Sequence, residues 1–292
     1  MRVVKVAAIQ MRCSEQMEQN LLKAEALVRQ AAEQGAQIIL LQELFALPYF
    51  CQKEKVEYAF YAKELTESKV VQHFQTIAKQ LRVVLPISFY EKKNQARYNS
   101  VAVIDADGEV LGVYRKSHIP DGPGYEEKFY FQPGDTGFQV WQTRYGKIGV
   151  GICWDQWFPE AARCMVLMGA EMLFYPTAIG SEPADPALDS KDHWQACILG
   201  HAAANLVPIV VANRVGTEIL EDSRITFYGS SFIAGPQGNI IQAANRVDET
   251  IITAELNLDQ IERQRVDWGI FRDRRPDLYK ILCSNDGKTI LS

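Results

Sequence analysis

The sequence lacks any run of about 18 consecutive apolar residues, the length that a helix needs to cross a bilayer. Its first residues, MRVVKVAAIQ, alternate like a β-strand and do not resemble a signal peptide. There is no basic cluster, and the net charge is −5. Nucleic acid and acidic membrane are therefore poor partners. We expect a cytoplasmic protein that acts on a small molecule.

No pair of cysteines has the C-x-x-C spacing of a redox motif or a zinc site. The six cysteines are widely scattered, at Cys13, Cys51, Cys153, Cys164, Cys197 and Cys283. In a chain without a secretion signal, such cysteines are more often reduced than paired. We therefore expect free thiols, and no metal or other cofactor.

Helices and strands interleave along the whole chain, with no repeat or linker between them. Helical spacing of apolar residues predicts helices over 16–34, 66–80, 159–169 and 190–206. Alternation or short apolar runs predict strands over 3–10, 36–43, 82–90, 98–105, 109–115, 138–142, 147–152, 171–176, 208–213, 228–234, 239–243 and 250–255. Several strand connections are too short for a crossover helix, which favours mixed sheets covered by helices. We expect an α/β fold in one domain over 1–292, with 257–292 as a C-terminal helix and tail.

Two long loops interrupt this pattern, at 116–137 and 176–189, and both are rich in glycine and proline. Loops longer than about 12 residues in a compact domain are usually functional. We therefore expect the binding pocket between them.

Cys153 follows the predicted strand 147–152 directly. In the segment GKIGVGICWDQWFPE, the apolar side chains Ile148, Val150 and Ile152 share one face, and the intervening glycines leave the other face bare. Pro159 suits the first position of the next helix. A side chain at such a junction is held rigidly and can face a pocket. The alternative is a buried core cysteine, which is what most free cysteines are.

Two charged residues also stand where predicted strands end. Glu43 closes the apolar run IILLQE, and Lys116 follows EVLGVYR just before a long loop. If the three strand ends meet at one edge, a carboxylate, an ammonium and a thiol share one site. The alternative is that Glu43 and Lys116 are solvent-exposed charges.

The segments LLQELF, YRKSHIP and GVGICWDQWFPE resemble the three signature segments of the nitrilase superfamily of carbon–nitrogen hydrolases, in the same order and spacing. The resemblance extends from about residue 4 to 280. It implies an α-β-β-α sandwich, a Glu43–Lys116–Cys153 catalytic set without metal, and assembly into homo-oligomers. A further family glutamate aligns with Glu127, and the neighbouring Glu126 is the competing choice.

The residue types suit hydrolysis of a carbon–nitrogen bond. A free thiol with a pKa near 8.5 is only a few per cent ionised at neutral pH and needs a base. Glu43 can accept the thiol proton and later activate water. Lys116 and the backbone N–H of Trp154 can stabilise the oxyanion, while Glu127 orients the groups.

The substrate class follows from the segments around the site. Superfamily members that hydrolyse N-carbamoyl amino acids carry arginine after the cysteine, where this chain has Gln156 and Trp157. Further stretches, such as GPGYEEKFYFQPGDTGF and FYGSSFIAGP, resemble a branch that acts on ureido amines. We therefore expect a cationic ureido substrate, with Glu182 as the partner of its distal ammonium. The same loop also carries Asp185 and Asp189, of which Asp189 suits a cap of the 190–206 helix. The alternative for Glu182 is an exposed loop charge or a helix cap. The expected pocket walls are Tyr49, Tyr125 and Trp154.

Other interpretations remain open at this stage. One is a redox or sensor protein based on the Cys153 thiol. Another is a catalytically silent scaffold, and within the enzyme class the alternatives are a nitrilase, an ω-amidase or a β-ureidopropionase-like enzyme. His118 is expected to have a structural role in hydrogen-bonding its loop, and Asp155 to cap its own turn.

Overall fold

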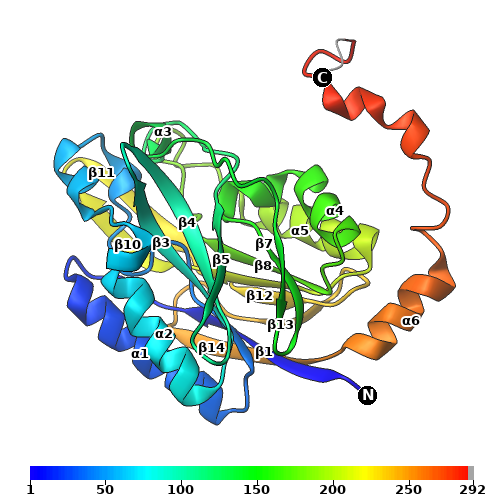
Figure 1. Ribbon diagram of the computed structural model, residues 1–292. Helices are drawn as coiled ribbons and strands as arrows, with labels where there is room; N and C mark the ends of the chain where they lie inside the picture. The colour runs from blue at the N-terminus through cyan, green and yellow to red at the C-terminus, as the bar shows by residue number, and fades with distance from the viewer. Residues whose placement is uncertain (289–292) are drawn as a thin grey trace.

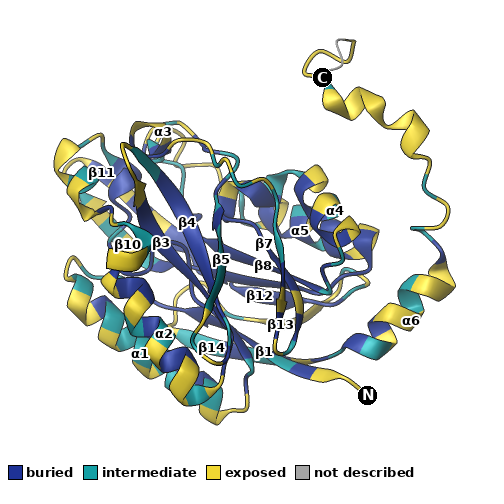
Figure 2. Cartoon of the chain, in the orientation of Figure 1, coloured by how far each residue is buried: buried dark blue, intermediate teal, exposed yellow. Residues whose placement is uncertain are grey.

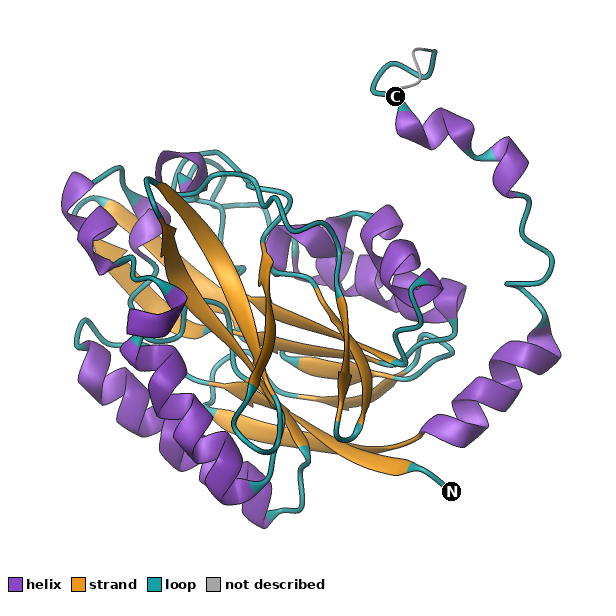
Figure 3. Cartoon of the chain, viewed as in Figure 1, coloured by secondary structure: helices purple, strands orange, loops and turns teal. Residues whose placement is uncertain are grey.

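Two β-sheets pack face to face between two pairs of helices in the computed structural model, which describes residues 1–288 (Figure 1; Figure 3). One sheet contains β14 (Thr250–Asn257), β1 (Val3–Gln10) and β2 (Ile38–Leu40), followed by β3 (Leu85–Lys93), β4 (Ala96–Ile104) and β5 (Val110–Arg115). A parallel bridge between Ile38 and Val84 joins its two halves. Helices α1 (Met17–Glu33) and α2 (Lys69–Leu81) cover its outer face.

The second sheet has the strand order β13-β12-β9-β8-β7-β6. Its strands are β13 (Ile240–Ala243), β12 (Phe232–Ala234), β9 (Ile209–Asn213), β8 (Met172–Thr177), β7 (Gly146–Val150) and β6 (Val140–Thr143). β7, β8 and β9 are parallel, and the strands outside them pair antiparallel. Helices α4 (Pro159–Leu167) and α5 (Lys191–Asn205) make the crossovers and pack on the outer face. The chain segments that follow β7, β8 and β9 therefore meet at one edge.

Alternation along the central strands explains the four layers. In β8, Met172 and Phe174 belong to the core between the sheets, while Leu173 and Tyr175 belong to the core under α4 and α5. Strands that are apolar on both faces must be covered on both faces. Figure 2 shows the result, with the central strands buried between helices that are exposed on their outer sides. The predicted α-β-β-α sandwich with mixed sheets is confirmed.

The structure corrects the prediction of one strand over 228–234. A hairpin of β10 (Val215–Leu220) and β11 (Ser223–Tyr228) forms a separate small sheet, and β12 begins only at Phe232. Between them, Gly229 and Ser230 both have positive φ, which ends β11. The predicted loop 116–137 contains a short helix, α3 (Glu127–Tyr130), and the segment after β2 contains three 3₁₀ turns, η1 (Phe50–Gln52), η2 (Val56–Tyr61) and η3 (Leu65–Glu67).

The C-terminal segment leaves the sandwich after β14. Helix α6 (Leu258–Trp268) is the predicted helix, and two further 3₁₀ turns follow it, η5 (Pro276–Leu278) and η6 (Lys280–Cys283). This segment runs along the outside of the molecule (Figure 1). Residues 289–292 of the predicted tail lie outside the described residues. Within 1–288, no helix is both long enough and apolar enough to cross a membrane. All six cysteines are unpaired, as predicted.

Candidate active site

Cys153 begins a 3₁₀ turn, η4 (Cys153–Trp157), immediately beyond β7. Its φ is 42°, a left-handed conformation that is strained for a residue with a side chain. The two preceding glycines, Gly149 and Gly151, let neighbouring side chains pack closely against the strand that leads into this turn. A Cβ on Gly149 would lie 2.8 Å from the sulfur of Met165, and one on Gly151 would lie 2.7 Å from the ring of Tyr175. Cys153 is 7% exposed.

Asp155 braces the turn from within. One carboxylate oxygen accepts hydrogen bonds from the Ile152 backbone N–H and the Tyr114 hydroxyl, each at 2.8 Å. The other accepts the backbone N–H of His118 at 3.0 Å and contacts the His118 ring nitrogen Nδ1 at 2.7 Å. The predicted role of Asp155 as a turn cap is confirmed. His118 has a structural role as predicted, but it bonds Asp155 in the η4 turn and not its own loop. Together they tie the segment that carries Lys116 to the segment that carries Cys153.

Lys116 lies between two carboxylates, and all three side chains are buried. Its Nζ donates to Glu43 Oε1 at 2.9 Å and to Glu127 Oε2 at 2.6 Å. Asn99, opposite the end of β5, donates from Nδ2 to the same Oε1 of Glu43 at 2.6 Å. Oε2 of Glu43 has no hydrogen-bond partner among the described residues. One oxygen of Glu43 is thus fixed, and the other is free to accept a proton.

The electrostatics of the cluster favour a neutral thiol. Burial raises the pKa of Cys153 well above its usual value, Glu43 raises it further, and Lys116 acts in the opposite direction. Burial alone would lower the pKa of Lys116, but Glu127 and Glu43 outweigh it and raise that pKa well above its usual value. The resting site therefore holds a protonated thiol and a charged ammonium at neutral pH. Attack by the sulfur requires a base beside it.

Cys153 and Glu127 open into a cavity of about 470 Å³ between the two long loops. Three carboxylates line it, those of Asp121, Glu127 and Glu182. Its aromatic walls are Tyr125, Trp154 and Trp157. Among the described residues, neither lysine nor arginine belongs to the lining. Burial, and next Asp185, raise the pKa of Glu182. The cavity favours a cation over an anion.

Most of the residues singled out in the sequence meet here. Glu127, and not Glu126, bonds Lys116. Tyr125 and Trp154 line the cavity. The Tyr125 hydroxyl also hydrogen-bonds the backbone of Gly180 and Ser181, in the loop that carries Glu182. Tyr49 differs from the expectation of a pocket wall, because it is buried behind Glu127 and donates its hydroxyl proton to Glu127 Oε1 at 2.8 Å.

Two residues at the site were not predicted. Asn99 is a polar residue within the buried strand β4, and this interruption of an apolar run is a signal that sequence reading can use. Arg214 follows β9 and is fully buried. Its bonds are made to the distant Glu43–Leu47 loop, and only the tertiary fold brings these segments together.

The buried carboxylate of Glu127 predicts a pH-dependent stability. Burial, with Glu43 adding to it and Lys116 opposing it, raises the pKa of Glu127 from 4.5 to about 7. Between these two values the folded protein binds more protons than the unfolded chain, so stability falls as pH rises. We expect a loss of about 3 kcal/mol from this group between pH 4.5 and pH 7. Urea unfolding of wild type and Glu127→Gln from pH 4.5 to pH 8 measures it, and parallel curves would contradict it.

Comparison with known proteins agrees with this geometry. The family described as carbon–nitrogen hydrolase matches residues 5–266. N-carbamoylputrescine amidase from Solanum tuberosum is 59% identical over 290 residues, with 98% of this chain and 97% of the relative covered. Citrullinase from Francisella tularensis is 52% identical over 276 residues, with 94% of this chain and 96% of the relative covered.

A solved structure is also similar over nearly its whole length. The crystal structure of a carbon–nitrogen hydrolase from Helicobacter pylori has a TM-score of 0.92 and 38% sequence identity. The match covers 97% of this chain and 99% of that one. The likeness in sequence and the likeness in fold therefore lead to the same group of proteins.

Proposed function

Because the chain belongs to the carbon–nitrogen hydrolase family, we propose that it is a cysteine-dependent amidohydrolase that cleaves N-carbamoylputrescine to putrescine, CO₂ and ammonia. Full-length relatives of that name, including the one from Arabidopsis thaliana at 58% identity, support this choice. Glu43, Lys116, Cys153 and Glu127 are the proposed catalytic residues.

The observation that carries the proposal is the charge of the cavity. The thiol lies at a cavity whose lining includes three carboxylates and, among residues 1–288, no lysine or arginine. N-carbamoylputrescine has a neutral ureido group at one end and an ammonium at the other. With the ureido carbon at Cys153, the ammonium reaches toward Glu182 along Tyr125 and Trp154. An ammonium that is taken out of water in this way needs a carboxylate partner.

In the first half of the reaction the sulfur of Cys153 attacks the ureido carbon. The thiol proton passes to the free Oε2 of Glu43, and the carbonyl oxygen becomes an anion. Lys116 and the backbone N–H of Trp154 donate hydrogen bonds to that oxygen. When the tetrahedral adduct collapses, the carbon–nitrogen bond breaks. The leaving nitrogen takes the proton back from Glu43, and a thioester remains on the enzyme.

In the second half, water hydrolyses the thioester. Glu43 accepts a proton from the water as its oxygen attacks the carbonyl carbon, and that proton returns to the departing sulfur. If ammonia leaves first, the product is the carbamic acid of putrescine, which loses CO₂; if putrescine leaves first, the product is carbamic acid, which gives CO₂ and ammonia. Both orders balance and regenerate the thiol. Glu127 keeps its hydrogen bond to Lys116 Nζ in both halves of the reaction and so fixes the position of the ammonium.

The citrullinase relative favours a second candidate substrate, citrulline. Citrulline has the same ureido end and an additional α-carboxylate. Gln156 is buried and does not belong to the cavity lining, so it does not offer that carboxylate a partner, and Trp157 is uncharged. A carboxylate in this cavity would lie among like charges, which disfavours binding. We therefore expect N-carbamoylputrescine to be the better substrate.

The proposal includes a cytoplasmic location and assembly into homo-oligomers. The six unpaired thiols support a reducing compartment. Assembly rests on the resemblance to the superfamily described above.

Glu182→Gln tests the ammonium site. We expect kcat/KM for N-carbamoylputrescine to fall about ten- to a hundredfold, because a charge-assisted hydrogen bond of about 1.5–3 kcal/mol is lost. N-butylurea lacks the ammonium and should be hydrolysed equally by both proteins. Steady-state kinetics with N-carbamoylputrescine, N-butylurea and citrulline provide the measurement.

Asp185→Asn is the matched control, because Asp185 is an exposed carboxylate of the same loop that does not belong to the cavity lining. It should change each kcat/KM less than threefold. Equal losses on N-carbamoylputrescine and N-butylurea in Glu182→Gln would contradict the ammonium site. A preference of the wild type for citrulline would contradict the substrate assignment.

A further inference from the structure

A buried guanidinium holds the main chain at the proposed general base. Arg214 is fully buried between β9 and β10. Its Nη2 donates to the carbonyl oxygens of Glu43 and Leu44, both at 3.1 Å, and its Nη1 donates to that of Leu47 at 3.0 Å. Three carbonyls of the loop that carries Glu43 therefore converge on one cation. The same Nη1 pairs with Glu218 Oε1 at 2.6 Å.

The ion pair of Arg214 and Glu218 is also linked to Glu127, the second carboxylate beside Lys116. The other oxygen of Glu218 accepts the backbone N–H of Tyr49 at 2.6 Å. The hydroxyl of Tyr49 in turn donates to Glu127 at 2.8 Å. Glu218 thus fixes the backbone of the residue whose side chain fixes Glu127. Arg214 is therefore linked to Glu43 through that residue's main-chain carbonyl, and to Glu127 through Glu218 and Tyr49.

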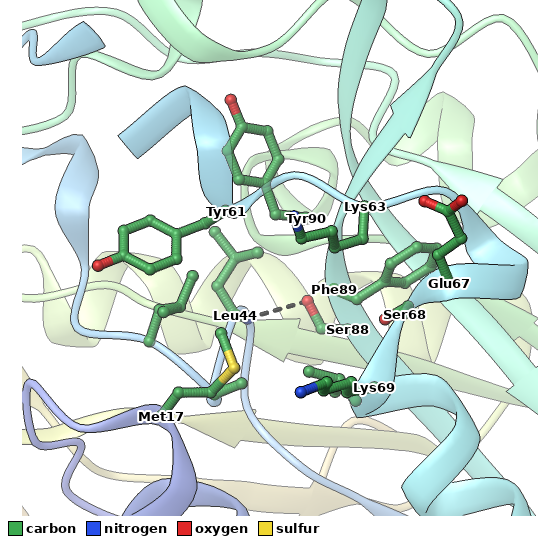
Figure 4. A pocket seen from close by; sticks show the side chains of 13 residues that line it. Met17, Leu44, Tyr61, Lys63, Glu67, Ser68, Lys69, Ser88, Phe89 and Tyr90 are labelled. Atoms are coloured by element: carbon green, nitrogen blue, oxygen red, sulfur yellow. Dashed lines mark hydrogen bonds between the residues drawn. The ribbon is translucent and has the colours of Figure 1, made fainter. Parts of the chain in front are cut away.

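On its other side the Glu43 loop is held by β3. Leu44 has a φ of 49°, so the loop turns sharply at the residue after Glu43. The backbone N–H of Leu44 donates to the hydroxyl of Ser88 at 2.9 Å, as Figure 4 shows at the wall of a small cavity of about 130 Å³. Arg214 therefore donates to the main-chain carbonyls of this loop, and Ser88 accepts from the backbone N–H of Leu44. A strained turn persists only where its surroundings hold it in this way.

We infer that Arg214 and Glu218 are positioning residues that set Glu43 and Glu127 against Lys116 and Cys153. The inference rests on the proposed function for the catalytic roles of those groups. Arg214 acts on Glu43 through the main chain, and on Glu127 through Glu218 and Tyr49. A displacement of about 1 Å in a catalytic group costs about 10² in rate, so the pair controls turnover without touching substrate.

Arginine is required at this position because of its shape. The planar guanidinium has several donors in a fixed fork and can serve three carbonyls and a carboxylate together. A lysine keeps the charge but places a single nitrogen at the end of its chain, so it cannot reach all four acceptors. Arg214→Lys therefore separates the geometry of the contact from its charge.

The test measures Cys153 alkylation by iodoacetamide alongside amide hydrolysis. In alkylation the sulfur–carbon bond forms, iodide leaves and the thiol proton passes to Glu43, so the rate reports the Glu43–Cys153 geometry without any ureido substrate. For Arg214→Lys at pH 7 we expect the Cys153 alkylation rate to fall at least tenfold. We expect kcat to fall ten- to a hundredfold with KM changed less than threefold. Peptide mass mapping assigns the labelled cysteine.

Controls separate positioning from stability. The exposed Cys164 is the internal control and should be alkylated at the same rate in both proteins. Arg265→Lys is the matched variant, because Arg265 is a half-buried arginine that bonds the Leu206 carbonyl at the end of α5. Arg265→Lys should lower the melting temperature and leave the rates of Cys153 alkylation and amide hydrolysis unchanged. Wild-type rates for Arg214→Lys per folded molecule would overturn the inference.

If Arg214→Lys does not fold, Glu218→Gln is the second test of the positioning role. The Glu218 side chain is 9% exposed, and the amide oxygen of the glutamine can still accept the hydrogen bond from the Tyr49 backbone N–H. A three- to tenfold fall in both rates supports the positioning role, and unchanged rates overturn it. A wild type that alkylates rapidly at Cys153 but leaves N-carbamoylputrescine intact would contradict the proposed function alone.

Discussion

Cys153→Ala should lower the hydrolysis of N-carbamoylputrescine by about 10⁴-fold or more, because no other group can form the covalent thioester. The fold should remain, since the side chain is small and the turn is braced by Asp155 and not by the sulfur. Steady-state kinetics measure the loss. Intact-protein mass spectrometry during turnover should detect a carbamoyl adduct on the wild type if putrescine leaves first, or a (4-aminobutyl)carbamoyl adduct if ammonia leaves first. The variant should show neither.

Cys164→Ala is the control for general thiol effects, because Cys164 is an exposed thiol on α4, which follows the η4 turn. It should retain full activity. Substantial activity in Cys153→Ala would exclude the covalent mechanism. Peroxide consumption by the wild type at a rate comparable with hydrolysis would instead favour the redox alternative.

Glu43→Gln should lower kcat by about 10³- to 10⁴-fold, a loss in line with removal of the base from a protein whose thiol is protonated. The amide oxygen can still accept from Lys116 and Asn99, so the geometry of the site is retained. Its amide nitrogen, however, has no lone pair that can take a proton where Oε2 now stands. Iodoacetamide should also alkylate Cys153 more slowly in this variant.

Glu126→Gln is the matched control, because Glu126 is a half-buried carboxylate beside Glu127 that does not contact Lys116. Its kcat should stay within threefold of wild type. A Glu43→Gln protein with a normal kcat would show that another group accepts the thiol proton. A large loss in Glu126→Gln would show that the second glutamate had been assigned to the wrong position.

Mixed sheets covered by helices were predictable from the residues, because each strand carries its own burial pattern. The order of the four layers was implied only by the resemblance to the nitrilase superfamily. Strand β7 has apolar side chains on one face and glycines on the other, so the close packing of α4 against it follows from GKIGVGI alone. The hairpin of β10 and β11 was missed. Its strands alternate between buried and exposed residues, but their boundary depends on positive φ at Gly229 and Ser230, and propensity does not locate such a turn.

The chemistry of the site was readable where a charged residue closes an apolar run, as at Glu43 and Lys116. Lys116 directly follows β5, but the predicted strand 36–43 is only Ile38–Leu40, so Glu43 lies three residues beyond β2. What holds those groups was not readable. Asn99, Tyr49 and Arg214 act through contacts between residues 56 to 171 positions apart in the chain. Such contacts depend on which sheet edges coincide, and local sequence does not specify that.

The sequence by itself determined most of the helices and strands, the positions of Glu43, Lys116 and Cys153 after apolar runs, and the acidic loop, because each depends on neighbours within a few positions. The tertiary structure alone decided that Tyr49 supports a carboxylate instead of lining the cavity, and that Arg214 holds the Glu43 loop. It also shows that Glu127, which the family resemblance had favoured over Glu126, bonds Lys116. These outcomes follow from packing between two sheets, where a buried donor must find its acceptor in another segment of the chain.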